Sequence, residues 1–112
     1  MITTTYKYQR KINVEDCQDL TKEVFPHLAS CTFLRSLNLS GTVIENLDFL
    51  IHGCSGSLTE LKVARTPLVD FNALLSCHRL LLLDLCHTQF HDVKLLANCQ
   101  RLRRLDLAGE GR

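Results

Sequence analysis

Apolar residues recur in one fixed pattern along most of the chain. Four segments share the spacing Leu-x-x-Leu-x-Leu, with Val as the last residue in one of them. The segments begin at Leu34, Leu58, Leu80 and Leu102. Because the second half of this spacing has period two, successive side chains face opposite sides, as they do in a β-strand. The pattern therefore predicts four short strands.

A second apolar pattern follows each of the first three predicted strands. Its members are three residues apart, so an apolar side chain returns once per tight helical turn. The three sets are Ile44, Leu47 and Leu50; Leu68, Phe71 and Leu74; and Phe90, Val93 and Leu96. One strand and one helical turn cannot enclose a core alone, but stacked copies bury a continuous aliphatic column. These copies predict an α/β repeat solenoid with a parallel strand face and short helical return segments.

The matched columns resemble the leucine-rich repeat family, in its short 22-residue subclass, over about 80 residues. The family usually has Asn at the ninth repeat position, where this chain has Thr42, Thr66 and Thr88. Threonine at this position is loosely similar to protist leucine-rich repeat proteins. A cysteine column closes the return segments at Cys31, Cys54, Cys77 and Cys99. We interpret the threonine hydroxyls as local partners for backbone groups and the cysteines as buried structural residues.

The N-terminal third departs from the full repeat. Phe25, Leu28 and Cys31 match the return segment, so residues 1–33 are predicted to form an N-terminal cap and a half-repeat, followed by repeats over residues 34–112. Asn13 is a plausible N-cap residue, which predicts a capping helix from Asn13 to Phe25 with Cys17 on its buried face. Residues 1–11 fit either an edge strand or a loose tail. The last repeat, after Leu102, is incomplete.

Composition excludes several classes of function and of compartment. The chain has 13 basic and 12 acidic side chains, so no overall field favours nucleic acid or a membrane. We find neither an apolar secretory signal nor a run long enough to span a bilayer. Six cysteines in 112 residues are fewer than a disulfide scaffold uses. An intracellular protein with reduced thiols is predicted, with the cytoplasm favoured and mitochondria or nucleus left open.

No residue pattern supports catalysis, a metal site or a cofactor. Cys86, His87 and His91 are the best candidates for metal ligands, but they lie on both sides of a predicted turn, without a nearby carboxylate set. A Cys–His nucleophile pair would also need an orienting third group and an oxyanion hole. The chain is therefore predicted to be non-enzymatic.

The predicted strand face carries the candidate binding site. Its third row places Leu81 and Leu82 where the neighbouring rows are polar or charged, which is typical of an interface centre with a charged rim. The chain is thus predicted to bind a protein partner along its concave strand face. The candidate partner-binding residues are Lys62, Leu81, Leu82, Asp84, His87, Arg103 and Arg104.

Two alternatives stay open. The chain is otherwise a structural subunit of a ribonucleoprotein or cytoskeletal assembly, docking through its uncapped C-terminal edge and the cluster Arg101, Arg103, Arg104 and Arg112. Nucleic acid is a weaker partner for these arginines because no aromatic stacking platform accompanies them. Further residues or another chain are expected to cover that edge. The family resemblance alone implies a third role, as a regulator of an enzyme.

Overall fold

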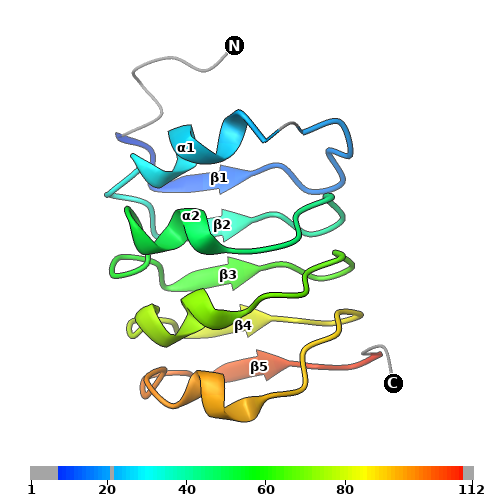
Figure 1. Cartoon of the computed structure of the whole chain (residues 1–112). Coiled ribbons are helices and arrows are strands. Elements are labelled where there is room, and N and C mark those ends of the chain that lie inside the picture. The colour runs from blue at the N-terminus through cyan, green and yellow to red at the C-terminus, as the bar shows by residue number, and fades with distance from the viewer. Residues whose placement is uncertain (1–7, 21, 110–112) are drawn as a thin grey trace.

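Five parallel strands form a single sheet in the order of the chain (Figure 1). The computed structural model describes residues 8–20 and 22–109. The strands are β1 (Lys11–Asn13), β2 (Ser36–Asn38), β3 (Glu60–Lys62), β4 (Leu82–Asp84) and β5 (Arg104–Asp106). Short helical segments cover one face of this sheet (Figure 1). The predicted α/β repeat solenoid with a parallel strand face is confirmed.

The strands align so that equivalent repeat positions are direct neighbours. Leu37 pairs with Leu61, and Leu61 pairs with Leu83. All three side chains are buried, and each buried leucine stabilises the fold by about 1.5–3 kcal/mol. The second leucine of the strand pattern therefore forms one continuous column through the stack, as the spacing predicts.

The return segments are helical and short. They are α1 (Val24–Ala29), α2 (Asp48–Ile51) and the 3-10 helices η2 (Asn72–Ser76) and η3 (Val93–Leu96). A carboxylate or amide oxygen precedes the last three and accepts the N–H two residues further on, at 2.9–3.1 Å. These acceptors are Asn46, Asp70 and Asp92. They occupy one repeat column that the sequence analysis did not single out, and they satisfy N–H groups that a helix start leaves free.

The helix predicted from Asn13 to Phe25 is wrong. Lys11–Asn13 is strand β1, which pairs with Ser36–Asn38, and helix α1 begins only at Val24. Asn13 does accept the backbone N–H of Glu15 at 3.0 Å, but it does so in a turn that ends a strand. Ile12 and Val14 occupy the positions of Leu37 and Leu39, so the segment is a divergent repeat strand. Of residues 1–11, Lys11 belongs to the edge strand β1, and residues 1–7 lie outside the described residues.

The threonine column has the local role that its position predicts. Each hydroxyl donates to the carbonyl three residues earlier, at 2.6–2.8 Å. The pairs are Thr42 with Leu39, Thr66 with Val63, and Thr88 with Leu85. All three threonines are buried. These hydroxyls close the turn after each strand.

The cysteine column is buried at all four positions. Burial raises the pKa of Cys54 and Cys77 to about 12 and raises the pKa of Cys31 and Cys99 as well. Neighbouring thiols along the column add to the effect at Cys54 and Cys77. Cys17, in contrast, is exposed, so its predicted burial on a cap helix is wrong.

The last repeat is less well covered than the others. Val93 is 64% exposed, whereas Leu47 and Phe71 at the same repeat position are 0% and 6% exposed. Leu102, Leu105 and Leu107 are half-buried, whereas Leu80, Leu83 and Leu85 at the same repeat positions are fully buried. The apolar column is thus open beside β5 among the described residues.

Candidate functional site

The strands bring six of the seven predicted binding residues together. In the strand register, the backbone of Lys62 lies beside that of Asp84, and the backbone of Asp84 lies beside that of Asp106. Leu82 lies between Glu60 and Arg104 in the adjacent row. The backbone carbonyl of Leu81 accepts the N–H groups of Arg103 and Arg104 at 2.8 and 3.0 Å. The six predicted residues thus lie in neighbouring rows of β3, β4 and β5 or directly before them, and we call this set the β4 patch: Lys62, Leu81, Leu82, Asp84, Arg103 and Arg104.

Leu81 and Leu82 differ from their prediction in one respect. Both side chains are half-buried rather than exposed. Neighbouring strands lie only about 4.8 Å apart, so the rows on either side cover part of each leucine. The apolar centre of the β4 patch is therefore smaller than two free leucines would make it.

His87 lies at the turn beyond β4 in a left-handed backbone conformation, with φ of 56°. It is exposed, and its ring lies over Gly109 of the next repeat, where an added Cβ would collide with the ring. A non-glycine residue in this conformation costs roughly 1–2 kcal/mol. The structure thus holds the imidazole next to the β4 patch at an energetic cost.

His87 belongs to a column of left-handed residues, one after each strand. Its members are Asp16, Gly41, Arg65, His87 and Gly109, with φ from 54° to 72°. Each residue is four positions after the central apolar residue of its strand. Glycine adopts this conformation without strain, yet only two members are glycine. The other three place functional groups along one edge of the strand face.

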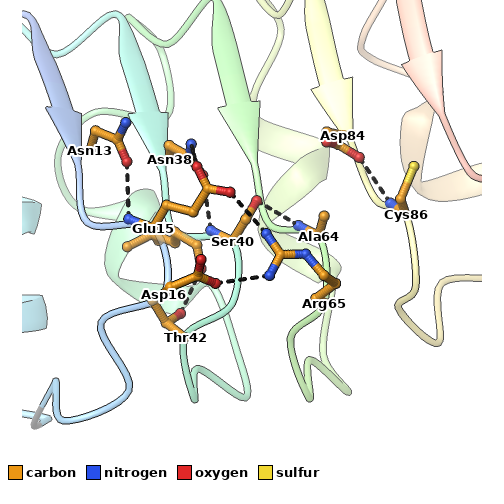
Figure 2. Close-up of polar contacts among 11 residues, drawn as sticks. Asn13, Glu15, Asp16, Asn38, Ser40, Thr42, Ala64, Arg65, Asp84 and Cys86 are labelled. Carbon is orange, nitrogen blue, oxygen red and sulfur yellow. Dashed lines mark hydrogen bonds and ion pairs between the residues drawn. The ribbon is translucent and has the colours of Figure 1, made fainter.

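Two members of this column form an ion pair that the sequence analysis missed. Arg65 donates to Asp16 at 2.8 Å and to Glu15 at 2.9 Å, and Asn38 donates to Glu15 at 3.1 Å (Figure 2). The hydrogen bond to Asp16 is the largest cause that raises the pKa of Arg65. Asp16 and Arg65 occupy the same repeat position, and Gly41 occupies it in the repeat between them. Opposite charges in this pattern could have revealed the pair from the sequence. We call the ion-paired residues Glu15, Asp16 and Arg65 the acidic clamp.

A set of turns after the strands fixes the polar side chains. Asn13, Asn38 and Asp84 each accept the N–H two residues further on at 3.0 Å (Figure 2). The side chain of Lys62 has no oxygen that could accept the N–H two residues further on. The hydroxyl of Ser40 accepts this N–H, that of Ala64, at 3.0 Å. The Asp84 carboxylate is thereby held in place inside the β4 patch.

The chemistry of Cys86 does not suit a nucleophile. Burial raises its pKa, and a hydrogen bond to Asp84 and the charge of that carboxylate raise it further. A raised pKa disfavours the thiolate, which is the reactive form. Within residues 8–20 and 22–109, no three His, Cys, Asp or Glu side chains gather as they would around a metal ion.

A groove of about 770 Å³ lies on the helical side, between α1 and α2. Its apolar walls include Phe25 and Phe49, whose rings stack 5.2 Å apart, and Val43. Glu45 and Asp48 lie at its rim together with Lys22. None of the predicted binding residues lines this groove.

The structure is similar in shape to solved structures, among them an internalin. The crystal structure of an internalin (inlF) from Listeria monocytogenes matches with a TM-score of 0.78 and 25% sequence identity, over 88% of this chain. The chain has a leucine-rich repeat fold. It spans 28% of the internalin chain. No protein-family model matches the sequence, and no curated protein does either.

Leucine-rich repeat solenoids present extended surfaces to other proteins, so the fold indicates a protein-interaction module in general. Among the described residues, none of the helices has the length and apolar character needed to cross a membrane.

Proposed function

We propose that this chain is a non-enzymatic module that binds a protein partner along its strand face, with Leu81 and Leu82 at the centre of the contact. Lys62, Asp84, His87, Arg103 and Arg104 form the rim in this proposal. The observation that carries it is the register around β4. Leu82 lies between Glu60 and Arg104, so an apolar centre is bordered by charges of both signs. Interfaces between proteins commonly have this arrangement.

Two of the rim side chains already have partners within the chain, which supports the proposal. Asp84 accepts the Cys86 N–H at 3.0 Å, and Arg104 pairs with Asp106 at 3.1 Å. The parallel strands beneath these side chains fix their spacing. Binding to ordered groups loses less conformational entropy than binding to mobile ones.

A comparison of two double variants tests the proposal. Leu81→Ser with Leu82→Ser removes the apolar centre, whereas Ile51→Ser with Leu75→Ser changes exposed apolar residues on the helical side. Wild type and both variants are used as bait, and captured proteins are quantified by mass spectrometry. We expect the strand-face variant to lose at least tenfold in the capture of proteins that wild type and the helical-side variant retain.

Equal capture by all three baits would contradict the strand-face proposal. Selective loss with the helical-side variant would place the contact on the other face. Circular dichroism of each variant establishes that the comparison is made between folded chains.

Compartment and domain organisation belong to the same proposal. We place the protein inside the cell, in the cytoplasm first, because six cysteines in 112 residues are fewer than a disulfide scaffold uses and reduced thiols persist in the cytosol. Residues 1–33 act as the N-terminal cap and half-repeat, and residues 34–112 act as the repeats that carry the contact. Strand β1 and helix α1 would supply the cap, in place of the longer helix.

A second candidate is a structural subunit that docks through its C-terminal edge. It is favoured by the exposure of Val93 and by Arg101, Arg103 and Arg104, which are all exposed beside the half-buried leucines of β5. Arg112 lies outside the described residues. Replacing Arg103→Glu and Arg104→Glu should weaken assembly and reduce its salt dependence. Unchanged assembly would remove the arginines from this candidate.

A further inference from the structure

The outer edge of β5, the last strand among the described residues, offers backbone groups in a repeating order. Each strand sends N–H groups forward to the next one, as Leu85 does to the carbonyl of Asp106 at 2.8 Å. Each also accepts from the next one, as the carbonyl of Leu81 does from Arg103 and Arg104. By this order, the N–H of Leu107 and the carbonyl of Arg103 point away from β4. No strand among the described residues pairs with them.

We propose that a second copy of this chain covers this edge, with the two β5 strands antiparallel about a two-fold axis at Leu105. Backbone groups of alternate residues face outward on an edge strand, and those of Leu105 face away from β4. An antiparallel pair centred on Leu105 therefore aligns donors with acceptors. Its core-facing side chains stay on the same side of the enlarged sheet.

Charge decides in favour of this register. Pairing about Leu105 sets Arg104 of each copy directly opposite Asp106 of the other, so the attractive contact occurs twice. A two-fold pairing centred one residue earlier would oppose Arg104 to Arg104. Centred one residue later, it would oppose Asp106 to Asp106. Directly opposed like charges destabilise a sheet, whereas opposite charges stabilise it.

Charge also disfavours the open-ended alternative, in which β1 of a second copy would continue the parallel sheet after β5. In the register that the five strands share, Arg104 would then lie beside Lys11, and Arg103 beside Arg10. Both neighbours are positively charged. The two-fold arrangement closes on itself, whereas the head-to-tail arrangement would grow into a filament.

The apolar surface beside β5 gains from the same contact. Leu105 and Leu107 are half-buried, and Val93, at the start of the return segment that precedes β5, is 64% exposed. A second β5 strand would bring Leu105 of the two copies together on the core side. The exposed end of the leucine column thus receives leucine from the second copy.

Two single charge reversals test this geometry. Arg104→Asp gives each copy two acidic residues at the contact, and Asp106→Arg gives each copy two basic ones. Light scattering over a hundredfold concentration range should give wild type a mass of twice the 12.7 kDa chain at high concentration. Each variant alone should stay at the mass of one chain.

An equimolar mixture of the two variants should recover the doubled mass, because residues 104 and 106 then attract at both positions. Arg35→Asp, which changes an exposed arginine beside β2, should dimerise like wild type. Recovery in the mixture also shows that both variants are folded. Should either fail to fold by circular dichroism, the milder pair Arg104→Gln and Asp106→Asn should each weaken the dimer at least threefold.

Three results would overturn the inference: a wild-type mass of one chain at every concentration, a mass that grows without limit, or a mixture that stays monomeric. The inference goes beyond the proposed function and does not depend on it. Leu81→Ser with Leu82→Ser should keep the doubled mass, so loss of partner capture and loss of the dimer are separately observable.

Discussion

Arg65 and Asp16 form an ion pair across the repeat that lies between them, directly over Gly41. Their side chains meet at 2.8 Å although 49 residues separate them in sequence. Gly41 leaves the space for this contact, because a Cβ there would collide with the Asp16 carboxylate and lie 3.0 Å from Arg65 Nη1. The acidic clamp thus requires that residue 41 carry no Cβ.

Gly41→Ala should lower the free energy of unfolding by more than the 1–2 kcal/mol or so that a left-handed alanine costs. Gly41 has φ of 72°, and the new methyl group would also displace the Asp16 carboxylate. Urea unfolding measures the change. In an Asp16→Ala background the collision disappears, so the same substitution should cost less. An equal cost in both backgrounds would mean that the clamp does not depend on the gap.

Gly53→Ala should destabilise the chain by about 1–3 kcal/mol, as overpacking does. A Cβ at Gly53 would collide with the backbone carbonyl of Ala29, at the contact between α1 and α2. Gly56→Ala in the same loop is the matched control, because its nearest neighbour would be His78 at 3.6 Å. Thermal unfolding should separate the two variants clearly. Similar melting temperatures would contradict the close approach of α1 to residue 53.

His87→Gly should raise the free energy of unfolding by up to about 1.5 kcal/mol. Glycine removes a left-handed penalty of roughly 1–2 kcal/mol but costs about 0.5–1 kcal/mol through its freedom in the unfolded chain. His87→Ala removes the same ring and keeps the penalty, so it should give no such gain. If His87 contacts the partner, both variants should weaken capture. If alanine gave as large a gain in stability as glycine, relief of backbone strain would not explain the gain.

The buried thiols should make stability fall above pH 9. Burial raises the pKa of Cys54 and Cys77 from 9.0 to about 12, so between these values the folded thiols keep a proton that the unfolded ones release. Unfolding then releases protons, and each thiol lowers stability by about 1.4 kcal/mol per pH unit. Below pH 9 neither thiol contributes a slope.

Urea unfolding of wild type and Cys77→Ala at pH 8, 9.5 and 10.5, with reductant present, isolates this effect. The other titrating groups are common to both proteins, so the variant should show the shallower decline. Parallel declines would show that Cys77 ionises as easily in the folded chain as in the unfolded one.

The repeating spacing of leucine, threonine and cysteine was sufficient to predict the sheet, the return segments and the threonine turns. Each repeat contacts mainly its two neighbours, so the local pattern determines the contacts of a residue such as Leu61 almost completely. The same pattern placed Leu81 and Leu82 on the strand face. It could not give their half-buried state, because that depends on the side chains of the flanking strands.

Asn13 marks the limit of this reasoning. An asparagine followed by Glu15 and Asp16 fits the start of a helix and equally fits the turn after a strand, because in both cases the amide oxygen accepts a nearby N–H. Pairing of β1 with β2 decided between them, since it buries Ile12 against the leucine column. The sequence determined the repeat. The tertiary structure alone decided where it begins and which distant charges, such as Asp16 and Arg65, meet across it.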